Sequence, residues 1–483
     1  MKKVRILLFG TGRFYQRRKE ELAKALYGDK IIGFIDNRAK EIGTFEEKPV
    51  YLPRDVLVLD FDYIVLMSIS FLEMKEQLLG LGVQRKKILV WEQYQATKPR
   101  LLRKDFLRKT KQPISNGKRV LVISVSLFLN GGSMAICYMV EELFHRGWNV
   151  TLLVPGGARE LICALQQRGI DVIVVPGLMF CEERYLRPWM QFDVVIVNVY
   201  QNIRLAYLFS KFVPTFWWIH EPSARYAPTL YPLHRKLFPQ LDTASWMGRV
   251  RIVAVSQMAK RNFEDYYPEQ VDYVLPLGER APEHIIFEKM TGSPLRFAII
   301  GSVVERKGQD VFLQAVRLLP ESLRQQAEFL IIGEDDPASS YGKLLSSLAE
   351  GIPQVRFQAP LLREQMMALF PKLDVIVCAS REETLSMTVV EGMMFGKICI
   401  TTDATGIAEY IEDGKNGYIV PAGDAAELAS CMKHVLEHAN ALDALRHAAR
   451  ATYENTFAMD VFGDHLEAEL QTTMQEWKWR CGK

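Results

Sequence analysis

The sequence predicts an α/β protein made of three successive units, each built around a mainly parallel sheet. Short apolar runs, typical of buried strands, alternate with longer amphipathic stretches, typical of helices, along almost the whole chain. A glycine turn follows the first strand of each unit, as expected where a strand passes into a helix. The chain has 483 residues, of which 49% are hydrophobic, and this is enough for about three domains with cores of their own.

Shifts in composition mark the boundaries between the units. The linker region, 98–119, carries nine basic residues and one acid, and its apolar residues could line one face of a helix. Such a segment suits peripheral contact with an anionic membrane, and a solvated linker helix packed on its own domain is an equal alternative. The expected divisions are a first α/β unit at 1–97, the basic linker at 98–118, a second unit at 119–291, a third at 292–455 and a C-terminal helix at 456–483.

Charge and cysteine content limit the classes of function. The net charge of +3 is too small to indicate nucleic acid as a partner. The seven cysteines are scattered and never in Cys-x-x-Cys spacing, which predicts reduced thiols in a cytoplasmic protein. The amino-terminal apolar run meets Gly10-Thr-Gly12 instead of a cleavage site, which indicates a strand and not a signal peptide. No apolar stretch approaches the roughly 20 residues that a bilayer span needs.

The first unit contains a pattern similar to a dinucleotide-binding fingerprint. Gly10-Thr-Gly-Arg-Phe-Tyr15 follows the first strand, and Asp36 ends the second strand, where an acid could bind a ribose. Tyr15 stands near the place of the third glycine and would obstruct close packing of helix on strand, so a structural role is favoured over cofactor binding. The expected elements of this unit are strands at 4–9, 31–35, 63–67 and 87–90, a helix ending near 26 and a helix at 72–81.

The second and third units repeat the alternation of strands and helices. Two sheets that face one another leave a cleft, and ligands commonly bind in such clefts. The strands expected in the second unit lie at 120–126, 149–154, 171–175, 193–197, 215–219, 251–255 and 271–275. Those expected in the third unit lie at 295–300, 327–332, 355–358, 375–378 and 397–401, and amphipathic helical sequence follows from 428 to 475.

Two glutamates at a strand-to-helix junction carry the strongest functional signal. Glu383 and Glu391 bracket seven residues at the carboxyl end of a buried strand, which is where open α/β sheets bind ligands. The first carboxylate can accept hydrogen bonds from a sugar, and the second can reach a ribose. The structural alternative is that the two glutamates only stabilise the N-terminus of a helix, where the helix dipole favours acidic side chains. Backbone N–H groups between the two can face a phosphate, namely those of Thr384, Leu385, Ser386 and Met387.

Four motifs occur in an order that resembles a known family. They are Asn130-Gly-Gly-Ser133, Trp217-Trp-Ile-His-Glu221, Glu305-Arg-Lys-Gly308 and the Glu383–Glu391 segment. From about residue 118 onward the chain is similar to a retaining glycosyltransferase of family 4. That resemblance implies the GT-B fold, in which two Rossmann-like domains face each other across a cleft and a terminal helix crosses back onto the amino-terminal half. The first unit resembles small Rossmann-like domains that precede some sugar-modifying enzymes.

The resemblance also implies roles for individual residues. Glu383 orients the sugar, His220 lies beside it, and Arg306 and Lys307 stabilise the leaving phosphate, whose developing charge requires cations. On sequence alone, a histidine at a strand end is more often structural. Many relatives have Gly-Arg where this chain has Gly301-Ser302, so Arg306 is expected to supply the missing charge. The expected donor-binding residues are Gly131, Gly132, Thr384, Leu385, Ser386, Met387, Glu391, Thr405 and Gly406.

Metal and cofactor binding are not expected. Asp60-Phe-Asp62 and Glu334-Asp-Asp336 have the spacing of metal-binding acids, but neither lies beside the other motifs, and acids are common in loops.

The pair Gly131-Gly132 would let backbone N–H groups approach a phosphate, and a tight turn is the structural alternative. Asn416-Gly417 predicts a hairpin turn.

We therefore expect a cytoplasmic, metal-independent glycosyltransferase without cofactors. It would move a hexosyl unit, with retention of configuration, from a nucleotide-diphosphate sugar, with UDP the expected nucleotide. The acceptor would be a glycan or lipid-linked hydroxyl in surface polysaccharide or glycoconjugate synthesis. Two alternatives stay open. The missing arginine near Ser302 would fit a weakly active or inactive binding subunit, and the unit spanning Gly10 and Asp36 would fit an oxidoreductase.

Overall fold

The structure is a computed structural model that describes residues 4–26, 28–68, 70–97, 117–128, 131–220, 241, 244–267, 269–283, 285, 294–334 and 336–480. The predicted linker at 98–118 lies almost wholly outside these residues, as do Asn130 and Glu221. The chain divides into two compact units. The first contains 1–111, 126–128 and 151–191, and the second contains 112–125, 129–150 and 192–483.

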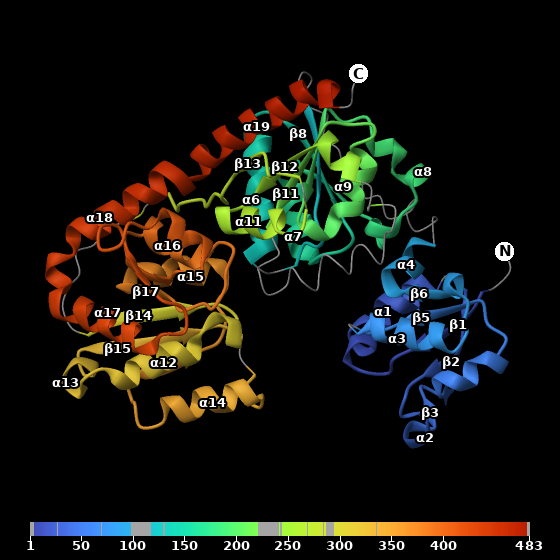
Figure 1. Cartoon of the computed structure of the whole chain (residues 1–483), viewed down its shortest axis with the longest axis horizontal. Helices are drawn as coiled ribbons and strands as arrows, with labels where there is room; N and C mark the ends of the chain where they lie inside the picture. The colour runs from blue at the N-terminus through green and yellow to red at the C-terminus, as the bar shows by residue number, and fades with distance from the viewer. Residues whose placement is uncertain are drawn as a thin grey trace. The chain divides into compact units, whose positions relative to one another are not determined.

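The first sheet lies in the first unit and has the strand order β3-β4-β2-β1-β5-β6 (Figure 1). Its strands are parallel except for the antiparallel pair β3 and β4, a short hairpin that the sequence did not predict. Tyr15 is buried against Phe34 and Phe45, so it fills the core beneath the helix instead of obstructing it. The elements are β1 (Arg5–Phe9), α1 (Arg13–Ala25), β2 (Lys30–Ile35), α2 (Ala39–Ile42), β3 (Thr44–Phe45), β4 (Lys48–Tyr51), β5 (Tyr63–Leu66), α3 (Phe71–Gly80), β6 (Ile88–Val90) and α4 (Trp91–Ala96).

The second sheet has the order β13-β12-β11-β10-β7-β8-β9. Its inner strands are continuous apolar runs, as expected for parallel strands covered on both faces, and Trp217 and Trp218 on β11 are fully buried. The elements are β7 (Arg119–Ile123), α6 (Gly131–His145), β8 (Asn149–Val154), α7 (Arg159–Gln167), β9 (Asp171–Val174), α8 (Glu183–Leu186), β10 (Val194–Asn198), α9 (Ile203–Phe209), β11 (Thr215–Ile219), β12 (Val250–Ala254), α11 (Gln257–Glu264) and β13 (Tyr273–Val274).

The third sheet is parallel throughout, with the order β16-β15-β14-β17-β18-β19. Met393 and Met394 are buried in its covering helix α16, as their apolar character predicts. The elements are β14 (Leu295–Ile300), α12 (Gln309–Leu318), α13 (Glu321–Arg324), β15 (Ala327–Ile332), α14 (Ser340–Ala349), β16 (Val355–Gln358), α15 (Arg363–Leu369), β17 (Val375–Cys378), α16 (Met387–Met394), β18 (Ile398–Thr402) and β19 (Tyr418–Val420).

The hairpin predicted at Asn416-Gly417 is wrong. The two residues end a turn that begins at Glu412, and the chain then enters β19, which pairs with β18 in parallel. The Asn416 side chain holds this turn by accepting from the Glu412 N–H at 2.7 Å and donating to the Tyr410 carbonyl at 2.9 Å. An asparagine-glycine pair thus marks a turn here without marking an antiparallel pair of strands.

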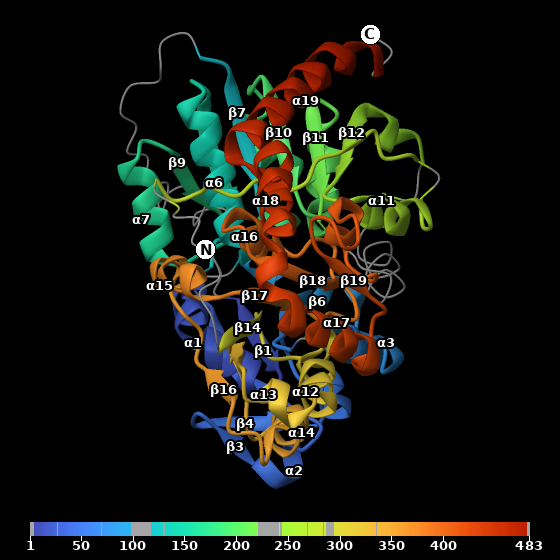
Figure 2. The same ribbon diagram turned by 90° about the vertical axis from the view of Figure 1, so that its left-hand side faces the viewer.

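Three helices end the described chain: α17 (Ala425–His438), α18 (Asp443–Thr452) and α19 (Met459–Arg480). The first two pack on the third sheet, whereas α19 packs on α6, β11 and β12 of the second, as Figures 1 and 2 show. Arg251 on β12 donates to Glu469 of α19 at 2.5 Å, and Phe462 stacks on Trp218. Among the described helices, none has both the length and the apolar composition to traverse a bilayer.

Candidate functional site

Glu383 lies between the side chains of two cations. Arg306 Nη1 donates to Glu383 Oε2 at 3.1 Å, and Lys307 Nζ donates to the same oxygen. Arg306 also donates to the Glu382 carbonyl at 2.7 Å. The cations follow β14 and the glutamate follows β17, which are neighbouring parallel strands, so their carboxyl ends meet at one edge of the sheet. All three side chains are mostly buried, which limits screening of their charges by water.

The backbone fixes the position of Glu383. Its N–H donates to the Ala404 carbonyl at 3.1 Å, and the Gly406 N–H donates to the Glu383 carbonyl at 2.8 Å. A Cβ atom at Gly406 would lie 1.9 Å from the Thr384 carbonyl oxygen, so only glycine allows these two loops to meet. The side chain of Thr405 is used within its own turn, where it donates to the Thr402 carbonyl at 2.8 Å.

The residues between the two glutamates lead into α16. Leu385 and Ser386 are buried, and the helix begins at Met387. The first N–H groups of any helix have no acceptor within it, so this end can donate to an anion. Gly308, just before α12, has φ +71°, and a Cβ atom there would lie 1.9 Å from the Ala379 carbonyl oxygen. The start of α12 is therefore held against the end of β17, beside Arg306 and Lys307.

An ion pair that the sequence did not reveal supports this edge of the sheet. Arg381 donates to both carboxylate oxygens of Asp310, at 2.8 and 2.6 Å, and to the Glu305 carbonyl at 2.6 Å. Burial opposes ionisation of Asp310, but the hydrogen bonds from Arg381 and Tyr341 prevail and lower its pKa. Arg381 thus ties the loop that carries Glu383 to the loop that carries Arg306.

The carboxylate of Glu391 is occupied by a second arginine. Arg363 on α15 donates to Glu391 and, at 2.5 Å, to Glu279, and it lies over the ring of Tyr138 on α6. Burial raises the pKa of Glu279 to about 8, with Arg363 opposing and Glu391 adding to the shift. Burial likewise raises the pKa of Glu391, and Arg363 opposes it. One guanidinium therefore serves two buried acids, and its single charge compensates them only in part.

Replacing Arg363 by methionine is expected to destabilise the protein by about 3 kcal/mol at neutral pH, since both buried acids lose their cation. The loss should be larger at pH 8 than at pH 5.5, because protonation relieves the two acids. Urea unfolding at the two pH values measures this. The control is Arg356→Met, which breaks an exposed pair with Glu328 and should cost less than about 1 kcal/mol. Equal losses in the two variants would contradict the role given to Arg363.

His220 follows β11 with its ring 4.5 Å from the ring of Trp218. Part of the residue reaches the surface, but Nε2 is shielded from water and has no hydrogen-bond partner among the described residues. Burial lowers the pKa of the imidazole to about 3. A neutral histidine with an unused ring nitrogen can bind a hydroxyl group of a ligand.

The pKa of His220 predicts a dependence of stability on pH. An unfolded histidine titrates near 6.5, so below that pH the unfolded chain gains a proton that the folded chain refuses. The free energy of unfolding should therefore fall between pH 6.5 and 3 by up to about 1.4 kcal/mol per pH unit. His220→Gln should remove this slope and His145→Gln, at an exposed position, should keep it. Urea unfolding between pH 5 and 7.5 is the test, and an unchanged slope in His220→Gln would contradict it.

Within the described residues, no hydrogen bond or ion pair joins Gly131, Gly132 or Ser302 to Glu383. Gly131 and Gly132 form the first turn of α6, and further along that helix Tyr138 contacts Arg363 of α15. Ser302 is exposed. Glu409, four residues after Thr405, accepts from the N–H groups of Gln257 and Met258 at 2.9 and 2.8 Å. It thereby caps α11 and joins the second and third sheets.

The acids with metal-like spacing have other partners. Asp60 pairs with Arg5, and Asp62 accepts from the Arg5 N–H at 2.7 Å. Asp336 accepts from the Ala338 N–H. The described part of the chain contains no group of three or more His, Cys, Asp or Glu side chains placed to hold a metal ion.

Three segments of the chain match known families. Residues 116–245 match "Glycosyl-transferase family 4", residues 284–452 match "Glycosyl transferases group 1", and residues 2–89 match "C2185-like, N-terminal". A D-inositol 3-phosphate glycosyltransferase of Corynebacterium urealyticum is 30% identical over 199 residues, which are 38% of this chain and 46% of that protein. A second such enzyme, of Corynebacterium kroppenstedtii, is 26% identical over 45% of this chain and 53% of its own. The chain thus spans about half the length of these relatives.

Solved structures share the fold. A glycosyltransferase from Rickettsia africae superposes with a TM-score of 0.61 at 16% identity, covering 74% of this chain and 99% of its own. The Anabaena protein HepE, in complex with UDP and glucose, has a TM-score of 0.58 at 17% identity, covering 73% of this chain and 99% of its own. At these identities the likeness concerns the fold alone.

Proposed function

The chain belongs to glycosyltransferase family 4 and has the GT-B fold with an additional N-terminal α/β domain, and from this we propose that it transfers a sugar from a nucleotide-diphosphate donor to an acceptor hydroxyl. The observation that carries the proposal is the cluster of Glu383, Arg306 and Lys307 beside two helix N-termini. In the proposed donor complex, the two cations hold the diphosphate and the carboxylate turns to the sugar hydroxyls. The N–H groups at the start of α16 add donors to the phosphates.

The proposed reaction needs no covalent intermediate. The bond between the anomeric carbon and the phosphate oxygen breaks, the acceptor oxygen bonds to that carbon from the same face, and the acceptor proton passes to the departing phosphate oxygen. Arg306 and Lys307 stabilise the charge that develops on the phosphate. His220, neutral and with Nε2 unbonded among the described residues, binds a donor hydroxyl. Retention of configuration and the hexosyl identity of the sugar form part of the proposal.

The proposed donor is a UDP-sugar, because HepE was solved with UDP-glucose. The proposed acceptor is a glycan or lipid-linked hydroxyl in surface polysaccharide assembly, because relatives include proteins named for capsular polysaccharide and amylovoran biosynthesis. The proposed location is the cytoplasmic side of a membrane, with peripheral contact through the basic segment 98–119.

The test is a screen of nucleotide sugars for thermal stabilisation, followed by a transfer assay with the donor that binds. A ligand at a hundred times its dissociation constant adds about 2.7 kcal/mol of stability, enough for a clear shift in Tm. Stabilisation by at least one nucleotide-diphosphate sugar, with release of the nucleoside diphosphate, is the expected result. The proposal fails if no such sugar stabilises the protein.

A binding or scaffolding subunit is the second candidate, favoured by the serine at 302 where many relatives have arginine. It predicts binding of the donor without turnover. Donor hydrolysis or transfer above the rate of Glu383→Gln rejects it.

A further inference from the structure

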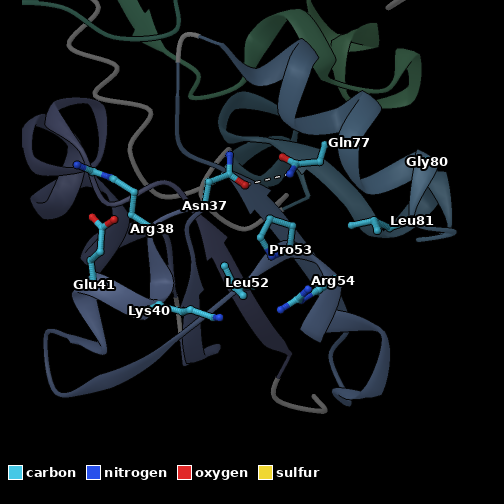
Figure 3. Close-up of a pocket in the computed structure, with 10 residues that line it drawn as sticks. All are labelled: Asn37, Arg38, Lys40, Glu41, Leu52, Pro53, Arg54, Gln77, Gly80 and Leu81. Atoms are coloured by element: carbon cyan, nitrogen blue, oxygen red, sulfur yellow. Dashed lines mark hydrogen bonds between the residues drawn. The ribbon is translucent and has the colours of Figure 1, made fainter.

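A pocket of about 560 Å³ lies in the first unit, and none of its residues belongs to the candidate site. This volume is in the range of small-molecule pockets. Its walls come from the segments that follow the carboxyl ends of β2 and β4 and from the end of α3, the edge at which parallel sheets bind ligands. The lining residues, shown in Figure 3, are Asn37, Arg38, Lys40, Glu41, Leu52, Pro53, Arg54, Gln77, Gly80 and Leu81.

The pocket is positively charged, with three cations against one acid, Glu41. In Figure 3 the side chains of Lys40 and Arg54 extend toward each other across Leu52. Lys40 has no ion-pair partner in the part of the chain that the structure describes, and Arg54 has only a long contact with Asp55 at 3.8 Å. Two cations that converge without a strong acidic partner form a place for an anion such as a phosphate.

The opposite end of the pocket carries two amides. Gln77 Nε2 donates to Asn37 Oδ1 at 3.0 Å, which leaves the Asn37 amide N–H groups and the Gln77 oxygen for a ligand. Pro53 and Leu52 lie between this pair and the two cations in Figure 3. The lining therefore passes from paired amides over an apolar surface to positive charge. In a nucleotide, the base and the phosphate are likewise separated, by the ribose.

Asp36, at the end of β2, is already bonded within the protein and is not needed for this mode of binding. Asp36 accepts from Thr11 Oγ1 at 2.8 Å and from the Arg38 N–H at 2.9 Å. Its carboxylate thus holds the turn to the end of β2. We propose that the pocket binds a nucleoside monophosphate, with the phosphate between Lys40 and Arg54 and the base against Asn37 and Gln77.

The test uses the full chain carrying Arg306→Ala and Lys307→Ala, so that the candidate donor site does not contribute. AMP, UMP and inorganic phosphate are titrated by calorimetry. At least one nucleotide should bind more tightly than inorganic phosphate. Adding Lys40→Glu and Arg54→Glu should weaken nucleotide binding at least about tenfold. The matched control adds Arg17→Glu and Lys24→Glu, which lie exposed on α1, and should retain binding.

A second substitution examines the other end of the pocket. Gln77→Leu should change the ratio of AMP to UMP affinity and leave the affinity for inorganic phosphate unchanged. The proposal is overturned if neither nucleotide binds, if inorganic phosphate binds as tightly as both, or if the α1 control loses as much affinity as the pocket variant.

Discussion

Replacing Glu383 by glutamine is expected to lower the rate of sugar transfer by at least about 100-fold, the usual cost of removing one stabilising group from a reaction centre. Affinity for a nucleoside diphosphate should not fall with it. In the structure Arg306 and Lys307 both pair with the Glu383 carboxylate, so a neutral amide frees them for phosphate. We expect UDP to bind equally or more tightly. Steady-state kinetics and calorimetry together measure the two effects.

Glu305→Gln is the matched control for this variant. Glu305 lies directly before Arg306 and its side chain is exposed. Its replacement by glutamine removes one negative charge near the cluster, as Glu383→Gln does. It should leave both rate and affinity within about twofold, as for a surface substitution. A Glu383→Gln enzyme with full activity would falsify the assignment of the reaction centre.

The double variant Arg306→Ala and Lys307→Ala should lose affinity for UDP, whereas Glu383→Gln should retain it. Affinity for UDP should fall at least about 100-fold, because two charge-assisted contacts to phosphate are lost in a partly buried site. The remaining binding should also depend less on salt. Calorimetry at low and high ionic strength gives both quantities.

The control for the double variant is Arg356→Ala with Lys433→Ala, which removes two exposed cations from the same part of the chain. Unchanged UDP affinity in the Arg306 and Lys307 variant would place the phosphates elsewhere. Reduced affinity in both double variants would indicate a general effect of net charge. Together, the Glu383 and Arg306–Lys307 variants separate binding from chemistry.

Most strands of the third sheet were predictable because they contain apolar residues and are bounded by turns. β14, β15, β16 and β17 begin and end at the predicted residues. The short strands β3 and β19 were missed, because two or three residues contain too few positions to show a period. Asn416-Gly417 was expected to join two antiparallel strands, because the pair shows only that a turn is present. The parallel pairing of β19 with β18 depends on contacts distant in the sequence, which the turn residues do not indicate.

The candidate site was predictable only where its residues lie close together in the sequence. Arg306, Lys307 and the Glu383–Glu391 segment have recognisable spacing. The pairs Arg381–Asp310 and Arg363–Glu279 join residues 71 and 84 positions apart, and no spacing links them. The engagement of Glu391 by Arg363 depends on how α15 and α16 pack, which is a property of tertiary structure alone.

Glu279 lies where the described chain passes from the second sheet toward the third. It is hydrogen-bonded to the segment between α18 and α19, where the chain crosses back to the second sheet. Its N–H donates to the Phe457 carbonyl at 2.8 Å, and its carbonyl accepts from Tyr453 at 2.8 Å. Its carboxylate meets Arg363, which also holds Glu391. The two segments that cross between the sheets are therefore bonded to each other at Glu279. Arg363 connects this crossing to Glu391, the carboxylate expected to bind the ribose. A ribose that displaced Arg363 from Glu391 would leave the guanidinium to Glu279, so the contacts at this crossing would remain when the site is occupied.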